Sequence, residues 1–282
     1  MLLNRKEILS TIKKSLSEDI GERDITTDLL IPKDKKVEAI ILAKEDTLIC
    51  GLEICKLFFK TLDSNIMFKA KFLDGDFVRK GRVIARIKGL AKPMLMAERS
   101  GLNMLSHLCG IATLTNRFVK AVRPYGVKIM DTRKTIPGLR LLEKYAVSRG
   151  GGYNHRIGLY DQVLIKDNHL KVVNSQWSVV NRAIKKAKRK KMISEIEIND
   201  LKELKEALIL SPDIIMLDNM NLAQIKKAVQ LRDLFSSRTK LEASGGINLK
   251  NIRAIAKTGV DFISIGSLTD SAQAIDMSLE VI

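Results

Sequence analysis

Residues 195–219 read EIEINDLKELKEALILSPDIIMLDN and contain a strand, a helix and a second strand in succession. The runs Glu195–Ile198 and Ile214–Leu217, rich in β-branched and aliphatic residues, have strand length, whereas Leu201–Leu210 between them repeats its leucines at helical spacing. Two strands joined by a helix pair in parallel through a right-handed crossover. This stretch therefore predicts an α/β fold with a parallel sheet.

The same alternation continues through the second half of the chain. Further short strands are expected at Val127–Met130, Gln162–Ile165, Lys240–Ala243 and Phe262–Ile265, and further helices at Ser178–Lys191, Leu222–Phe235 and Leu249–Thr258. About six such units fall short of the eight that close a full α/β barrel. We therefore predict an incomplete or open barrel, and a doubly wound sheet is the alternative.

The first half has a different pattern. Residues 37–50 and 66–90 predict strands around a helix at Leu52–Leu62, and a long helix at Met96–Val122 leads into the barrel-like half. A length of 282 residues allows about two domains at roughly 150 residues each.

Composition excludes several classes of protein. The longest apolar runs, such as Ala39–Ala43, span about five residues, whereas a membrane helix needs about 20. The N-terminus has no apolar core of a signal peptide. Three cysteines without a Cys-x-x-Cys pair argue against a disulfide framework and a structural zinc site, so we expect a reducing, cytoplasmic compartment.

The net charge of +17 points to anionic partners. The densest basic run, Arg182–Lys191, has seven basic residues in ten, with Ala183, Ile184 and Ala187 expected on one buried helix face. A solvated helix face is favoured over a nucleic-acid patch. Aromatic residues make up 5% of the chain and none interleaves with this run, so a stacking surface for single strands is not expected.

Polar and charged residues follow or end each predicted strand. They are Asp131–Lys134, Lys166–His169, Glu195 with Glu197, Asp218–Asn219, Ser244–Gly246 and Gly266–Ser267. Because the carboxyl ends of parallel strands lie at the same end of a barrel or edge of a sheet, these groups predict a substrate site there. A structural or interaction protein would not need such a set.

Two kinds of group stand out at these strand ends and in the loops around the first two strands. Glycine lets backbone N–H groups approach an anion, and a helix expected from near Asn248 would add its positive end, so Ser244, Gly245, Gly246 and Gly266 favour a phosphate grip. The cations Arg133, Lys134, His155, Arg156 and Lys166 favour a pocket for several carboxylates or phosphates.

Four of these residues have open interpretations. His155 is alternatively a hydrogen-bonded core residue. Glu197 and Asp218 suit a divalent metal on a diphosphate, or the hydroxyls of a sugar. Ion pairing with the cations opposite is an equal alternative for Glu195 and a weaker one for Glu197.

Several longer motifs match one known family in order and spacing. They are ERSGLN at 98–103, GIAT at 110–113, DTRKTIPGLR at 131–140, GGGYNHR at 150–156 and LIKDNH at 164–169. Through them the chain resembles the quinolinate phosphoribosyltransferases from Asp19 to Thr269. Ser100 stands where that family more often has threonine.

The resemblance implies an architecture of the type II phosphoribosyltransferases. It implies an α/β sandwich-like N-terminal domain at 1–115, with residues 270–282 packing back on it, and an open α/β barrel of about six strands at 116–269. It also implies a homodimer or larger homo-oligomer whose active sites are shared, with Arg99 contributed by the neighbouring subunit.

The resemblance also implies an enzyme of NAD biosynthesis. Such an enzyme transfers phosphoribosyl from phosphoribosyl pyrophosphate (PRPP) to quinolinate with decarboxylation, and it needs neither nucleic acid nor a membrane. By this likeness Lys134, Lys166, Glu197 and Asp218 are catalytic, and the last two hold the ribose or its Mg²⁺. Arg99, Arg133, His155 and Arg156 join them in binding substrate, and Ser244, Gly245, Gly246 and Gly266 bind the 5′-phosphate. The alternative is a related transferase acting on another base, such as the molybdenum-operon paralogue.

Overall fold

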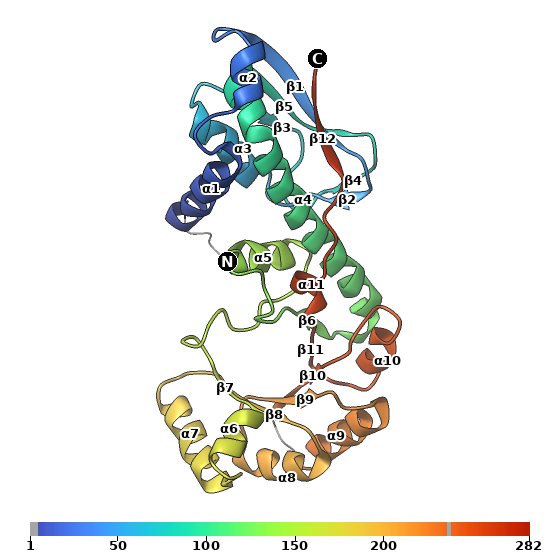
Figure 1. Cartoon of the computed structure of the whole chain (residues 1–282). Helices are drawn as coiled ribbons and strands as arrows, with labels where there is room; N and C mark the ends of the chain where they lie inside the picture. The colour runs from blue at the N-terminus through green and yellow to red at the C-terminus, as the bar shows by residue number, and fades with distance from the viewer. Residues whose placement is uncertain (1–4, 236–237) are drawn as a thin grey trace. The chain divides into compact units, whose positions relative to one another are not determined.

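The computed structural model describes residues 5–235 and 238–282 and divides into two compact units (Figure 1). The N-terminal unit comprises Met1–Asn116, Thr135–Gly151 and Leu268–Ile282, and the barrel unit comprises Arg117–Lys134 and Gly152–Ser267. The segment Thr135–Gly151 thus belongs with the first unit although it follows the first strand of the barrel.

The N-terminal unit is built on an antiparallel sheet of four strands in the order β12-β1-β5-β3. The strands are β1 (Lys36–Ala43), β3 (Met67–Ala70), β5 (Val83–Leu90) and β12 (Met277–Val281), and β2 (Thr47–Leu48) pairs separately with β4 (Phe77–Val78). β12 pairs with β1 from Ala39 opposite Val281 to Ala43 opposite Met277. The last strand of the chain therefore completes the first sheet, and this unit is mixed α/β as expected.

The helices of this unit are α1 (Arg5–Ile20), α2 (Ile25–Leu30), α3 (Leu52–Leu62), α4 (Ala91–Val122) and α5 (Arg140–Arg149). α3 has the predicted bounds, and α4 begins before the predicted Met96 and runs across the boundary into the barrel unit. Gly110 on α4 is required by packing, because a Cβ there would lie 2.1 Å from the carbonyl oxygen of Gln273 in the returning C-terminal segment. In the described part of the chain no helix is both long and apolar enough to cross a bilayer.

The barrel unit contains the predicted parallel sheet of six strands, in the order β6-β11-β10-β9-β8-β7. The strands are β6 (Lys128–Met130), β7 (Val163–Ile165), β8 (Ser194–Ile198), β9 (Ile214–Asp218), β10 (Lys240–Ser244) and β11 (Phe262–Ser264). From β7 to β11 each strand lies beside the next in sequence, and β6 lies beyond β11. A doubly wound sheet would reverse this order at a switch point, so the open barrel is confirmed.

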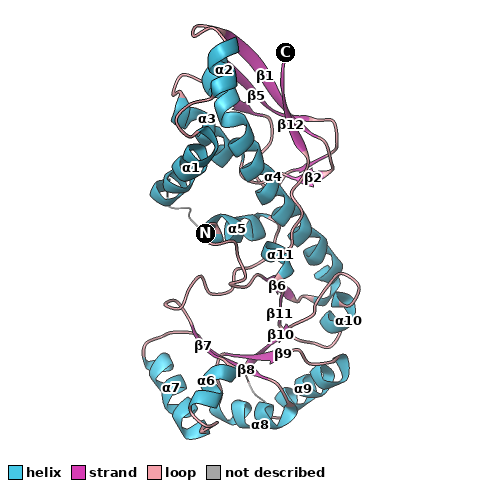
Figure 2. Cartoon of the chain, in the orientation of Figure 1, coloured by secondary structure: helices cyan, strands magenta, loops and turns pink. Residues whose placement is uncertain are grey.

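Helices cover the outer side of this sheet, with α7, α8 and α9 lying along it in Figure 2. The helices after the strands are α6 (Asp167–Val172), α7 (Trp177–Arg189), α8 (Leu201–Leu210), α9 (Leu222–Leu234), α10 (Ile252–Ala256) and α11 (Ser267–Asp270), and a 3₁₀ turn covers Arg123–Tyr125. α8 has the predicted bounds because the Asp200 side chain accepts hydrogen bonds from the N–H groups of Lys202 and Glu203 and so caps it.

The basic run lies mostly on α7. Val180, Ile184 and Ala187 form its buried face and Ala183 is exposed, so the prediction is correct for Ile184 and Ala187 and wrong for Ala183. The reason is the helical period: Val180, Ile184 and Ala187 follow one another at spacings of four and three, whereas Ala183 lies about 100° around the helix from Ile184. The basic side chains occupy the remaining, exposed faces.

Candidate active site

The carboxyl ends of β8, β9 and β10 bring acidic and hydroxyl groups together. Asp218 and Ser244 are the last residues of β9 and β10 and are register partners. Glu197 on β8 pairs in register with Met216, two residues before Asp218. These side chains therefore lie at the same end of the sheet, as the sequence predicts.

Lys166 and Glu197 form an ion pair across the strands β7 and β8. The Lys166 Nζ lies 2.9 Å from Glu197 Oε2, and the lysine side chain is 45% exposed while that of the glutamate is 8% exposed. The carboxylate is thus buried in the barrel unit, whereas the lysine side chain is partly exposed, so an anionic substrate could contact it. Ion pairing with a cation opposite, the weaker alternative for Glu197, is present in this structure.

Asp218 carries an unfavourable charge. Burial and the negative charge of Glu197 raise its pKa, while the amide of Asn219, the hydroxyl of Ser244 and the charge of Lys166 oppose the rise. The Asn219 Nδ2 donates to Asp218 Oδ2 at 2.8 Å. Two neighbouring, partly buried carboxylates repel one another, and a divalent cation or sugar hydroxyls would relieve that repulsion.

The glycine turn after β10 packs directly against Asn219. Gly245 has a φ of +92°, and a Cβ there would lie 2.1 Å from Asn219 Oδ1 and 2.9 Å from the Asn219 backbone nitrogen. Position 245 therefore has no room for a larger residue, and Gly245 and Gly246 are both exposed. The regular helix α10 begins at Ile252, four residues after Asn248, where a helix start is expected from the sequence. The Asn248 N–H donates to the Asn251 side chain, and the Ile252 N–H donates to the Asn248 carbonyl oxygen at 3.0 Å, so a turn at 248–251 leads into the helix.

Two guanidinium groups lie close together in the barrel unit. Burial and the positive charge of Arg133 lower the pKa of Arg156, and the charges of Glu195, Asp161 and Glu197 oppose that shift. Arg156 is 7% exposed and its Nη1 donates to the Gln162 carbonyl oxygen at 3.4 Å. Arg156 is buried and Arg133 is half-buried, and an anion that contacts both guanidinium groups would stabilise the pair.

Lys134, Gly266 and Arg99 differ in their positions. Lys134 follows Arg133 with an exposed side chain, and its backbone N–H donates to the Thr132 hydroxyl at 3.0 Å. Gly266 follows β11 at the same end of the sheet as the other strand-end groups. Arg99 is exposed on α4 of the N-terminal unit, so it is not among the cations that the barrel unit itself brings together.

His155 lies one layer deeper, among carboxylates. Its Nδ1 accepts a hydrogen bond from the Arg156 N–H at 2.8 Å, and its Nε2 lies 3.0 Å from Glu195 Oε2 and 3.8 Å from Glu242 Oε1. Glu195 also accepts from the Gln162 amide at 2.7 Å. The imidazole is 6% exposed, which is the hydrogen-bonded core position that the sequence left open for this residue.

Sequence reasoning missed two polar residues of this deeper layer, Gln162 and Glu242, and placed Asp131 among the strand-end groups. Asp131 Oδ1 accepts from the His155 N–H at 2.8 Å, and Asp131 and Glu242 are fully buried. The signal for Glu242 is its position within the apolar strand Lys240–Ser244, two residues before Ser244, as Glu195 stands two residues before Glu197. A residue two positions earlier on a strand points to the same side, one layer further in.

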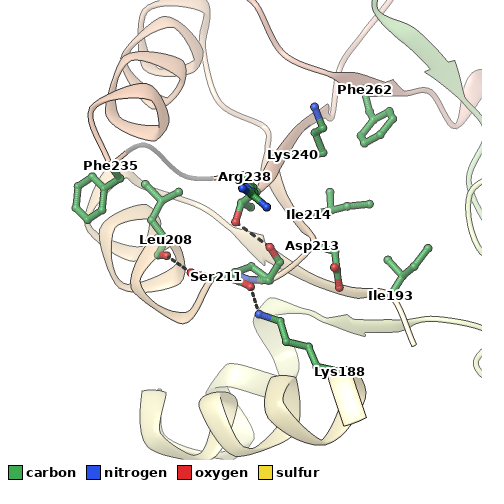
Figure 3. Close-up of a pocket in the computed structure, with 12 residues that line it drawn as sticks. Lys188, Ile193, Leu208, Ser211, Asp213, Ile214, Phe235, Arg238, Lys240 and Phe262 are labelled. Carbon is green, nitrogen blue, oxygen red and sulfur yellow. Dashed lines mark hydrogen bonds between the residues drawn. The ribbon is translucent and has the colours of Figure 1, made fainter. Parts of the chain in front are cut away.

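A hollow of about 720 Å³ lies at the opposite, amino ends of the strands (Figure 3). Its walls include Phe235, Phe262 and Lys240, and Lys188 of the basic run reaches it and donates to the Ser211 carbonyl oxygen. None of the strand-end groups described above lines it. The basic run therefore contributes to the far end of the barrel and not to the candidate active site.

The fold and the site first define a class. A parallel barrel whose strand ends carry guanidinium and ammonium groups, two acidic side chains and a glycine turn is an enzyme scaffold for polyanionic substrates. The family follows from sequence comparison: residues 24–109 match the quinolinate phosphoribosyl transferase N-terminal domain, and residues 111–280 match the C-terminal domain. The chain belongs to the quinolinate phosphoribosyl transferase family.

Individual relatives agree with this assignment. The chain is 43% identical over 283 residues to a probable nicotinate-nucleotide pyrophosphorylase [carboxylating] of Methanocaldococcus jannaschii, covering 97% of each chain. A solved nicotinate-nucleotide pyrophosphorylase from Ehrlichia chaffeensis has a TM-score of 0.93, 38% identity and full coverage of both chains. The corresponding structure from Francisella tularensis has a TM-score of 0.91 and 40% identity, covering 100% of this chain and 98% of that one.

Proposed function

We propose that the protein transfers the phosphoribosyl group of PRPP to quinolinate and releases pyrophosphate, CO₂ and nicotinate mononucleotide, a step of NAD biosynthesis. Family membership and the names of the relatives support this proposal. The observation that carries it is the pair Arg133 and Arg156 at the same end of the barrel as the acids Glu197 and Asp218. The cations can bind the anionic substrates, and the acids can stabilise the positive charge that develops on the sugar.

The cations offset the charges of the substrates. Quinolinate brings two carboxylates and PRPP brings several phosphate charges into one pocket. Repulsion between two like charges at about 4 Å is about 4 kcal/mol at an effective dielectric constant of about 20. The charges of Arg133, Arg156 and the partly exposed Lys166 lower this cost, and the three side chains orient the pyridine nitrogen toward the anomeric carbon. Lys134 and His155 belong to the same proposed binding set.

The acids suit the sugar. As the bond from the anomeric carbon to pyrophosphate breaks, the ribose acquires oxocarbenium character, which the negative charges of Glu197 and Asp218 stabilise. The pyridine nitrogen then forms the new bond to the anomeric carbon. In the resulting pyridinium the 2-carboxylate leaves as CO₂, its bonding electrons pass to the ring carbon, and that carbon takes up a proton. The protein mainly positions the two substrates and neutralises their negative charges.

Glu197 and Asp218 also fit Mg²⁺ bound to the diphosphate of PRPP. Their mutual repulsion, seen in the raised pKa of Asp218, is what a divalent cation relieves. Mg²⁺ in such sites takes one or two carboxylates and completes its shell with phosphate oxygens and water. Ser244, the exposed glycines Gly245 and Gly246, and Gly266 would hold the 5′-phosphate through backbone N–H groups.

We further propose a homodimer or larger homo-oligomer in the cytoplasm, with Arg99 completing the neighbouring subunit's site. Arg99 is exposed on α4 of the N-terminal unit, which is compatible with this role. An isolated chain would then have an incomplete site.

The direct test is incubation with Mg²⁺, PRPP and quinolinate labelled in its 2-carboxyl group. The proposal predicts labelled CO₂ and pyrophosphate in equal amounts, both dependent on PRPP. Nicotinate in place of quinolinate should give no product, because it lacks the second carboxylate that the cations bind. Turnover of another base, with none of quinolinate, would contradict the proposal.

A further inference from the structure

The deeper layer of the barrel unit contains two carboxylates that burial has removed from water. Glu195 and Glu242 are both 0% exposed, and their ligand atoms and that of His155 all lie within 4.8 Å of one another. Glu195 Oε1 and both carboxylate oxygens of Glu242 have no hydrogen-bond donor at normal geometry. Two ionised carboxylates in such a place would be strongly destabilising, so either a cation or a proton must neutralise one of them.

The hydrogen bond at His155 Nδ1 discriminates between these two possibilities. Nδ1 accepts from the Arg156 N–H at 2.8 Å, so the proton of the neutral ring is on Nε2, the nitrogen that faces both carboxylates. A metal ion bound by Nε2 would require the proton on Nδ1, where it would point at the Arg156 N–H. The geometry therefore disfavours a metal among these three residues and favours a proton.

We propose that Glu242 is a neutral carboxylic acid in the working enzyme, and that together with Glu195 it positions the His155 imidazole below the substrate site. One carboxylate oxygen of Glu242 and one of Glu195 lie within 4.8 Å of each other, and a proton on Glu242 removes the repulsion between two buried negative charges. Glu195 in turn faces His155 Nε2 and accepts from Gln162. Glu242 is a positioning residue, since it contacts the reaction through His155.

The groups around Glu242 all bear on its charge. Burial and the negative charges of Glu195 on β8 and Asp131 after β6 raise its pKa to about 8, while His155 and the Ser264 hydroxyl on β11 oppose the rise. Ionisation of Glu242 would place a second negative charge near the groups that, under the proposed function, bind quinolinate. The inference rests on that function for its effect on substrate but not for the state of Glu242.

The first test needs no substrate. In the unfolded chain Glu242 ionises near its ordinary pKa of 4.5, whereas in the folded chain it keeps its proton to about 8. The wild type should therefore lose stability as pH rises between these values and level off above them. Glu242→Gln cannot ionise, so its Tm should exceed that of the wild type by a margin that grows over this range.

Two control variants separate this effect from ordinary loss of a carboxylate. Glu206→Gln removes an exposed acid from α8 and should leave the pH dependence of Tm unchanged. Glu143→Gln removes an equally buried carboxylate whose oxygens contact His107 Nε2 at 2.8 Å and accept from the Ile136 N–H at 3.2 Å. Because Glu143 is fully partnered, its replacement should lower Tm, opposite to Glu242→Gln.

The second test uses the reaction. Between about pH 7 and about pH 9 the wild-type KM for quinolinate should rise by about threefold or more with a smaller change in kcat, and the KM of Glu242→Gln should stay within about twofold. If no quinolinate turns over, the proposed function fails while the stability test still decides the state of Glu242. The inference is overturned if Glu242→Gln lowers Tm at every pH, if both KM profiles rise alike, or if stoichiometric metal is found in the wild type and is lost in the variant.

Discussion

Replacement of Gly245 by alanine should damage the proposed phosphate turn by a predictable amount. The new Cβ would lie 2.1 Å from Asn219 Oδ1, 2.6 Å from its Cγ and 2.9 Å from its backbone nitrogen, at a φ of +92°. Adopting a left-handed conformation costs an alanine about 1–2 kcal/mol. Forcing a methyl group into an occupied space costs about 1–3 kcal/mol more, so the expected destabilisation is about 2–5 kcal/mol.

The same change should affect function through a specific contact. To make room, Asn219 must move, and its Nδ2 hydrogen bond to Asp218 at 2.8 Å is then lost. Because the turn and Asp218 are both proposed to bind PRPP, the KM for PRPP should rise more than the KM for quinolinate. Denaturant unfolding gives the stability change, and steady-state kinetics with each substrate varied gives the second comparison.

Gly246→Ala is the matched control. Gly246 also has a positive φ, of +62°, but a Cβ there would meet no atom within 4 Å. Its replacement should cost about 1 kcal/mol of backbone strain and no steric penalty. Equal losses of stability in the two variants would refute the packing argument, and an unchanged KM for PRPP in Gly245→Ala would refute the role of the turn.

Three further predictions follow from the site. Arg133→Ala should raise the KM for quinolinate by about tenfold or more, because a charge-assisted hydrogen bond is worth about 1.5–3 kcal/mol. Its circular dichroism spectrum should stay that of the wild type. Wild-type kinetics in this variant would show that Arg133 is not part of the site. Mixed dimers of an Arg99→Ala chain and a Lys166→Ala chain should recover part of the activity that each homodimer lacks, and no recovery in verified mixed dimers would exclude shared sites. Because the pKa of Asp218 is raised, the binding of PRPP and Mg²⁺ should weaken as the pH falls, and this loss should begin at a higher pH than it would with an ordinary aspartate. Glu197→Gln removes one cause of the raised pKa, so it should move this loss of binding to lower pH. If the pH at which binding is lost does not move, the two acids are not coupled.

Much of the barrel unit is predictable from local pattern. Short β-branched runs alternate with helical segments, so strand and helix positions such as Ile214–Asp218 and Leu201–Leu210 follow from periodicity and capping. The strand-end residues also follow, because parallel strands present their carboxyl ends on one side. Local pattern does not predict that Thr135–Gly151 belongs to the N-terminal unit, because this depends on contacts between segments distant in sequence.

The deeper polar layer shows a second limit of sequence reasoning. His155 is readily assigned to a cationic pocket from its neighbours Asn154 and Arg156, but its contacts are with Glu195 and Glu242. Alternation on a strand indicates which side a glutamate faces, but not that strands two apart curve around one imidazole. Burial and hydrogen-bond partners, which decide the charge of Glu242, are properties of the folded chain.

The most direct measurement of the central claim is a crystal structure of the protein with quinolinate. The account predicts that the ligand's two carboxylates contact Arg133, Arg156 or Lys166 at the carboxyl ends of the barrel strands, with the pyridine nitrogen facing the side of Glu197 and Asp218. Quinolinate bound elsewhere, such as in the hollow lined by Phe235 and Lys240 at the amino ends, would contradict it.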